Sequence, residues 1–324
     1  MRPRVFWFVL LLFVVLGGGL GLWQGVTHYY RAPGPSEQQT TVVIPKGSSV
    51  KQVASALADA GVIRDRRGFR ILSAIYGADR LLKAGEYSIP AEASVRAVMS
   101  ILKSGNTVVH QVTIPEGLTS AEILNILNQA YGLVDMVTEV PPEGSLMPET
   151  YSYTYGDTVA EMIARMSRAM DREVAVLWAG RDEGLPFHSP DEAVTMASLV
   201  EKETGVPAER SRIAAVFINR LKKNMKLQSD PTVVYAISPT GPLGRRLTRQ
   251  DLDVSSPYNT YEVYGLPPGP IANPGKDAIY AVLHPLKTDE LYFVADGSGG
   301  HSFAKTLREH NNNVREWRRA RRKR

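Results

Sequence analysis

The chain has 324 residues, of which 44% are hydrophobic and 22% charged, and this length predicts roughly two globular domains. The formal net charge is +5, but six positive charges lie in Arg318–Arg324, so the rest of the chain carries about −1 and lacks the basic surface of a nucleic-acid-binding protein. No cysteine is present, which excludes thiol catalysis, thiolate metal sites and disulfides. We expect residues 314–324 to form a solvated, disordered basic tail.

The N-terminus contains an uncharged apolar run from Val5 to Trp23. Its length matches the roughly 20 residues that cross a bilayer as a helix. A cleaved signal peptide is the alternative, but its apolar core usually has only about 7–15 residues and an A-x-A site follows it. Because Arg2 and Arg4 precede the run, we expect residues 1–4 in the cytoplasm, a transmembrane anchor over 5–23, and the remaining residues outside.

A polar segment with two prolines, residues 24–40, follows the anchor and is typical of a stalk. Tyr29 and Tyr30 are suited to the outer interfacial belt of the membrane.

A weak internal repeat comes next. Thr41–Ile63 and His110–Leu133 each contain an alternating apolar strand, an Ile-Pro-x-Gly turn, a Ser or Thr, and an amphipathic helix. Gly85–Gly105 is a looser copy without the turn glycine. The irregular spacing argues against a solenoid and favours a small α+β module over residues 41–109. The layout fits either a plain packed core or a LysM-like glycan-binding module.

After a long helix over Val159–Trp178, a second helix begins at Ser189, a good N-cap, and stops at Thr204-Gly205. Two carboxylates, Glu201 and Glu203, lie near its end, about 200° apart around the helix axis. Since a carboxylate in apolar surroundings is costly unless it is neutral or paired, two interpretations remain open. The carboxylate acts as a general acid, or it pairs with an arginine of the following helix. Those candidate partners are Arg210, Arg212 and Arg220.

Three polar segments follow, Leu227–Ile237, Ser255–Gly275 and Tyr292–Phe303, and we expect them to be loops whose amides, hydroxyls and tyrosines bind sugars. The six histidines lack metal-ligand spacing, and the chain has neither a P-loop nor a G-x-G-x-x-G after a strand. We therefore expect no metal and no cofactor.

The motifs LVEKETGVPAERSRIAAVFINRLKKNMKLQSDP, SPYNTYEVYGLPPGPIANPG and LYFVADGSGGHSF closely resemble the YceG-like family, the endolytic murein transglycosylases also called MltG. The resemblance implies an α+β protein with a LysM-like module over 41–109 and a catalytic domain over 110–313. It implies Glu201 as the catalytic acid, with Glu203 as the alternative. The polar residues of the same motifs are candidates for substrate binding: Glu203, Asn219, Gln228, Asp230, Asn259 and Tyr261.

The resemblance also implies the chemistry. One acid protonates the glycosidic oxygen between N-acetylmuramic acid and N-acetylglucosamine, and as a carboxylate it then takes the proton of the C6 hydroxyl, which leaves a 1,6-anhydro end. A paired-acid glycosidase requires two carboxylates, and the sequence shows no obvious second one. A water-using muramidase and a non-catalytic glycan-binding scaffold are the alternatives.

The implied setting is the bacterial inner membrane, with the catalytic domain in the periplasm. The implied partners are peptidoglycan strands, penicillin-binding proteins and other cell-wall synthesis proteins, and the implied role is the termination of nascent strand elongation. Nucleic acid is not an expected partner.

Overall fold

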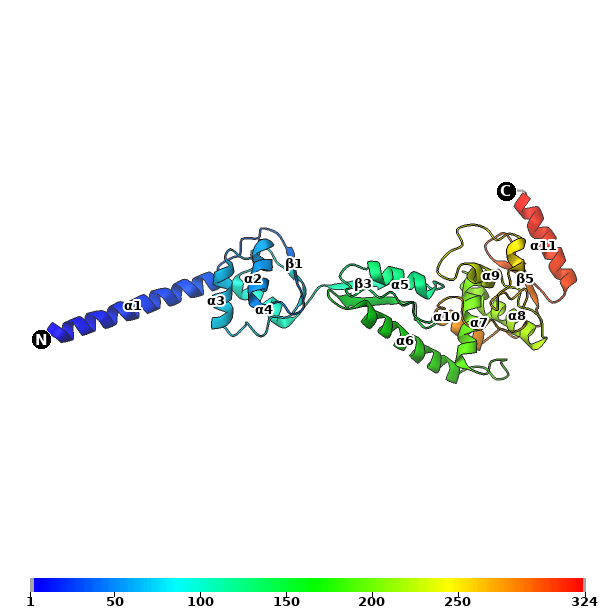
Figure 1. Ribbon diagram of the computed structural model, residues 1–324, viewed down its shortest axis with the longest axis horizontal. Helices are drawn as coiled ribbons and strands as arrows, with labels where there is room; N and C mark the ends of the chain where they lie inside the picture. The colour runs from blue at the N-terminus through cyan, green and yellow to red at the C-terminus, as the bar shows by residue number, and fades with distance from the viewer. Residues whose placement is uncertain (1–2, 323–324) are drawn as a thin grey trace. The chain divides into compact units, whose positions relative to one another are not determined.

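The computed structural model describes residues 3–322 and divides into two units (Figure 1). The N-terminal unit extends to His110 and also includes Ser152–Gly156. The C-terminal unit comprises Gln111–Tyr151 and the chain from Asp157 onward. Helices predominate, and three two-stranded sheets accompany them, so the fold class is mixed α+β as expected.

The N-terminal unit has the order strand, helix, helix, strand, helix after its first helix. Its elements are β1 (Thr40–Ile44), α2 (Val50–Asp59), α3 (Arg66–Ile75), β2 (Gly85–Ile89) and α4 (Val95–Ser104). The strands β1 and β2 are antiparallel, and Thr40 lies opposite Ile89. Alternate residues of both strands face the helices and form one core that includes Leu57, Phe69 and Tyr87.

The first helix, α1 (Pro3–Arg31), corrects the expected stalk. The part from Phe6 to Arg31 is long and apolar enough to cross a membrane. The helix does not stop at Trp23 but continues unbroken, and Val26, Tyr29 and Tyr30 pack against the core of the N-terminal unit. The two tyrosines therefore pack against the protein itself and do not depend on a membrane interface for their contacts.

The three repeat copies fold as strand, turn and capped helix, as the sequence predicted. Ser49 and Ser94 cap α2 and α4, and Thr119 caps α5 (Ser120–Gln129). The copy at His110–Leu133, however, contributes to another sheet, in which β3 (Val109–Thr113) pairs with β4 (Thr150–Thr154). The division between the two units falls within these two strands.

The C-terminal unit is mainly helical. Its remaining helices are α6 (Val159–Ala179), α7 (Pro190–Glu203), α8 (Arg210–Lys222), α9 (Asp230–Ile237), α10 (Lys276–Leu283) and α11 (Leu307–Arg322), with short 3-10 helices η1 (Pro207–Glu209) and η2 (Gln250–Asp253). A hairpin of β5 (Tyr292–Ala295) and β6 (His301–Ala304) precedes α11. The core forms around α7, against which α6, α8, α9 and α10 pack (Figure 1).

Three expectations for this unit were wrong. Leu227–Ile237 is not a loop throughout, because Asp230 and Pro231 begin α9. Tyr292–Phe303 is not a loop either, because most of it forms the antiparallel β5–β6 hairpin. The basic tail is not disordered over its described residues, since α11 continues to Arg322. Thr306 and Glu309 form a reciprocal cap at its start, a capping box that the sequence analysis overlooked. Residues 323–324 of the predicted tail and Arg2 at the other end lie outside the described residues.

Candidate active site

The helix α7 places the two candidate acids in its last turn. Ser189 caps its first turn, and the residues from Ala193 to Val200 are all buried. Within this stretch the Ser198 hydroxyl accepts a hydrogen bond from the Ile271 amide (3.0 Å) and donates one to the Thr195 carbonyl (2.7 Å). This contact fixes the Gly- and Pro-rich loop before α10 against α7, so the end of the helix is held from several sides.

Glu201 is held by an ion pair and by a helix terminus. Its Oε1 accepts a hydrogen bond from the Arg210 guanidinium (3.3 Å), and its Oε2 accepts one from the amide of Gly275, the N-cap of α10 (2.9 Å). The side chain is only 6% exposed. Both carboxylate oxygens of Glu201 are therefore engaged by groups of the protein itself.

Arg210 belongs to a larger charge network. Its guanidinium also contacts Glu116 (3.1 Å) and Asp277 (3.3 Å), so three carboxyl groups share one cation. Burial and the neighbouring charge of Glu201 raise the pKa of Glu116, although Arg210 opposes this rise. The ion pair with an arginine of the following helix, one of the two interpretations left open by the sequence, is therefore present at Glu201.

Glu203 has different partners. Its Oε1 accepts a hydrogen bond from the Ser229 hydroxyl (2.5 Å), and no salt bridge to it is found among the described residues. Burial raises the pKa of Glu203 to about 7, even though the hydrogen bond from Ser229 acts in the opposite direction. Near neutral pH this carboxyl group is thus poised between its protonated and charged forms, as a general acid requires.

Ser229 is positioned by a small buried network. Its amide donates to the Thr260 hydroxyl (2.9 Å), and its carbonyl accepts a hydrogen bond from the Thr232 hydroxyl (2.7 Å). Thr232 and Thr260 are also hydrogen-bonded to each other (2.9 Å). Because Ser229 and both threonines are buried, the hydroxyl that reaches Glu203 has little freedom to move.

Other charged groups act on Glu203 electrostatically. The carboxylate of Asp230 raises its pKa, whereas positive charge on His301 and Arg220 lowers it. Asp230 accepts a hydrogen bond from the Tyr261 hydroxyl (2.6 Å). Burial, and to a smaller extent this contact, raises the pKa of Tyr261, so its hydroxyl keeps the proton that it donates.

His301 is held by both oxygens of Glu209. One carboxylate oxygen accepts from the His301 amide (2.9 Å), and the other lies 2.7 Å from its Nδ1. A carboxylate at Nδ1 fixes the orientation of the imidazole ring and leaves its Nε2 for other contacts.

The predicted site residues fall into two groups. Glu203, Asp230 and Tyr261 lie together, and Gln228 directly precedes Ser229 with a left-handed backbone (φ 53°). Asn259 is instead fully buried and donates to the carbonyls of Leu252 (2.9 Å) and Val254 (2.8 Å), which shapes the loop.

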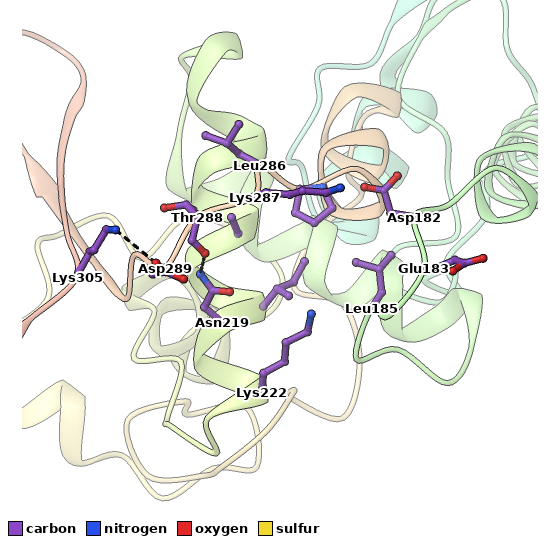
Figure 2. A pocket seen from close by; sticks show the side chains of 13 residues that line it. Asp182, Glu183, Leu185, Asn219, Lys222, Leu286, Lys287, Thr288, Asp289 and Lys305 are labelled. Carbon is purple, nitrogen blue, oxygen red and sulfur yellow. Dashed lines mark hydrogen bonds and ion pairs between the residues drawn. The ribbon is translucent and has the colours of Figure 1, made fainter.

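Asn219 lies elsewhere. Its amide donates to the carbonyls of Thr288 (2.7 Å) and Glu290 (3.0 Å), at the edge of a polar hollow of about 530 Å³. Figure 2 shows this hollow, with Asn219 beside Thr288 and with Lys305 directed at Asp289. The amide of Asn219 is therefore already used by the protein itself.

The sequence did not predict three residues of this site, Ser229, His301 and Glu209. Ser229 stands in the Q-S-D-P motif at the start of α9, and His301 follows the glycines of the β5–β6 turn, so each had a local signal. Their proximity to Glu203 depends on tertiary contacts that the sequence does not show. Among the described residues, no group of three His, Asp or Glu side chains is placed to hold a metal ion.

Comparison with known proteins identifies the family of the chain. The family model described as the YceG-like family matches residues 42–316. The chain belongs to the YceG-like family. An endolytic murein transglycosylase of Bacillus subtilis is 36% identical over 86% of this chain and 85% of its own length. One from Streptococcus pneumoniae is 30% identical, covering 95% of this chain and 64% of the relative. A crystal structure of a YceG-like protein from Listeria monocytogenes has a TM-score of 0.53 and 33% identity, covering 86% of this chain and 99% of that one.

Proposed function

We propose that this YceG-like protein is an endolytic murein transglycosylase and that Glu203 is its catalytic acid. The observation that carries the proposal is the environment of Glu203, whose pKa burial raises to about 7 and whose one hydrogen-bonding partner in the described chain is the Ser229 hydroxyl. The relatives of the chain are endolytic murein transglycosylases, which supports the reaction class. In this proposal, Glu203 takes the role that the sequence analysis assigned to Glu201.

The proposed reaction uses the two protonation states of Glu203 in turn. The protonated carboxyl donates to the glycosidic oxygen as the bond to the muramic acid C1 breaks through an oxocarbenium-like state. The resulting carboxylate accepts the proton of the C6 hydroxyl, whose oxygen bonds to C1 and forms the 1,6-anhydro ring. The proton balance closes, and Glu203 is protonated again. Ser229, by donating to Oε1, leaves Oε2 to carry the proton.

Glu201 is a positioning residue in this scheme. Its two hydrogen bonds join the last turn of α7 to α8 through Arg210 and to the start of α10 through Gly275. Because both of its oxygens already accept hydrogen bonds within the protein, the side chain is held in place between these elements.

A water-using muramidase is the second candidate, and the observation that favours it is Asp230. Its carboxylate is exposed, acts electrostatically on Glu203, and is oriented by Tyr261. A second carboxylate near the acid is what an inverting glycosidase needs to activate water.

The products separate these possibilities. Purified full-length protein in detergent is incubated with long glycan strands, and the new ends are analysed by mass spectrometry. Anhydro-muramyl ends, each lighter by one water than a reducing end, are expected together with fragments of many lengths, as internal cleavage produces. Reducing ends that disappear in Asp230→Asn indicate the muramidase instead. If Glu203→Gln cleaves as fast as the unaltered chain, the assignment of Glu203 as the acid is wrong. If neither the unaltered chain nor Glu203→Gln cleaves the strands, the protein is a non-catalytic glycan-binding scaffold.

The finer assignments are part of the same proposal. The β1–α2–α3–β2 order with antiparallel strands supports a LysM-like, glycan-binding character for the N-terminal unit. The length and apolarity of α1 support a single-pass anchor in the inner membrane, with the N-terminus in the cytoplasm and the catalytic domain in the periplasm. The proposed substrate is the peptidoglycan strand. The proposed partners are penicillin-binding proteins and other cell-wall synthesis proteins, and the proposed role is the termination of nascent strands.

A further inference from the structure

The face of the N-terminal unit beside α1 has the composition of a membrane-binding surface. In Figure 1, α3 lies crosswise to α1 near the C-terminal end of α1. A groove of about 620 Å³ separates the two helices, and it is lined by Gly21, Leu22 and Gly25 of α1 and by Gly68 and Ile71 of α3. A helix that lies across a membrane-spanning helix at its end runs roughly along the membrane plane.

The depth of α3 follows from the continuity of α1. Leu22, which lines the groove, belongs to the uncharged run that begins at Val5. At 1.5 Å per residue, the axial distance from Val5 to Leu22 is about 26 Å, close to the roughly 30 Å thickness of the hydrocarbon core. Ile71, on the other wall of the same groove, is therefore expected at the boundary between hydrocarbon and headgroups.

The N-terminal unit is attached to α1 without a flexible linker. Val26 and Tyr29, which also line the groove, pack on the core of the unit, and the ring of Tyr30 stacks on that of Tyr76 with centroids 4.1 Å apart. The unit therefore has to follow α1, and it stays at the membrane surface when α1 crosses the bilayer.

The outer surface of α3 is apolar where it adjoins the groove. Its inner face buries Phe69, Leu72 and Ser73. One turn apart on another face, Ile71 and Ile75 are 59% and 53% exposed, although isoleucine is among the residues most often buried. Side chains at positions i and i+4 form one stripe on a helix, so the two isoleucines form a single apolar stripe.

Cations lie beside this stripe. A second hollow, of about 610 Å³, is lined by five cationic side chains: Lys51, Arg64, Arg66, Arg67 and Arg70. Arg66 is paired with Asp59 (2.5 Å). The carboxylate lining this hollow is that of Asp65, which is engaged in capping α3 through the amides of Arg67 (3.1 Å) and Gly68 (2.6 Å).

We propose that α3 and its neighbouring arginines dock on the anionic phospholipid surface of the membrane that α1 crosses. An apolar stripe bordered by arginines is the pattern of a helix that lies in the interface, and each basic residue near an anionic surface adds attraction. The docked surface holds the N-terminal unit against the bilayer rather than letting it move on a stalk. The proposal rests on the membrane anchorage proposed above and is independent of the cleavage chemistry.

Site-specific probes test the docking, since the chain has no cysteine and each introduced cysteine is unique. Full-length Ile71→Cys and Ile75→Cys are labelled with an environment-sensitive fluorophore and reconstituted into vesicles of phosphatidylcholine and phosphatidylglycerol that contain a lipid-borne quencher. Thr41→Cys, on the exposed side of β1, is the matched aqueous control, and Leu12→Cys reports on the anchor.

Strong quenching is expected at positions 71 and 75 and at Leu12, and weak quenching at Thr41. If the label at Leu12 is quenched while the labels at Ile71 and Ile75 behave like the label at Thr41, the docking surface is wrong although the anchor is correct. If the label at Leu12 is not quenched, both the anchor and the docking surface are wrong. Cleavage of glycan strands is measured separately and tests the proposed enzyme activity in either case.

The lipid chemistry has its own test. With Arg67→Gln/Arg70→Gln, quenching at Ile71 is expected to fall severalfold in the anionic vesicles, toward its value in pure phosphatidylcholine. The double variant Arg96→Gln/Lys103→Gln removes two charges from α4 and is expected to leave quenching unchanged. Equal quenching in anionic and neutral vesicles, or equal loss in both double variants, contradicts recognition of anionic headgroups by α3.

Discussion

Replacing the proposed acid is expected to make the protein more stable at neutral pH. The pKa of Glu203 rises from its ordinary 4.5 to about 7 because burial disfavours its charged form. In Glu203→Gln a neutral side chain of nearly the same shape takes its place and still accepts the hydrogen bond from Ser229. The substitution thus removes a destabilising charge from the site.

The sign and the size follow from proton linkage. Between pH 4.5 and 7 the unfolded chain has lost the proton that the folded chain keeps, so stability falls as pH rises through this range. The rise of the pKa from 4.5 to about 7 corresponds to a loss of stability of roughly 3 kcal/mol, which is complete above pH 7 and absent below pH 4.5. Glu203→Gln is therefore expected to be more stable than the unaltered chain by about 3 kcal/mol at pH 8 and by far less at pH 5.

Urea unfolding of the detergent-solubilised protein, followed by tryptophan fluorescence, measures this difference, because Trp178 packs against the core of the C-terminal unit. The matched control is Glu201→Gln, which breaks a nearly buried ion pair and is expected to cost about 1–3 kcal/mol at both pH values. A Glu203→Gln protein that is less stable than the unaltered chain at pH 8 would refute the reasoning, as would a difference that does not change with pH.

Further substitutions test other contacts of the site. The cleavage rate is expected to decline as pH rises through about 7, the pKa of Glu203. Ser229→Ala removes a hydrogen-bond donor that lowers this pKa, so the decline should move to higher pH. A pH profile that does not move would contradict the role of this hydrogen bond. Gly275→Ala, whose Cβ would lie 1.9 Å from Oε1 of Glu116, displaces that carboxylate from Arg210 and is expected to cost about 1–3 kcal/mol, checked by calorimetry against Gly205→Ala, where the Cβ meets nothing within 4 Å. Ser198→Ala leaves the buried Ile271 amide without its acceptor and should also cost about 1–3 kcal/mol in the same urea assay; a change within 0.5 kcal/mol would show that the contact contributes little.

Local signals in the sequence predicted the local structure well. Ser189 and Thr204 delimit α7 as expected, and the serine or threonine after each repeat strand caps a helix. These features depend on hydrogen bonds between residues a few positions apart, which is why a single sequence reveals them. The helical phase that separated Glu201 from Glu203 is likewise reflected in their distinct partners.

The sequence did not predict contacts between distant segments. The expected stalk is a helix because Val26, Tyr29 and Tyr30 find a core to pack against, and composition alone does not show that core. The choice between the two acids depends on Ser229 and Gly275, which are 26 and 74 positions from their carboxylates. Only the fold shows which acid meets a cation and which meets a hydroxyl.

Turnover of long glycan strands by Glu203→Gln and Glu201→Gln, measured side by side at pH 6.5, tests the central claim most directly. Loss of general acid catalysis costs about 10²–10⁴ in rate, so Glu203→Gln is expected to be slowed to that extent while Glu201→Gln keeps readily measurable cleavage. The reverse order, with Glu201→Gln inactive but folded and Glu203→Gln active, would contradict the assignment of Glu203 as the acid.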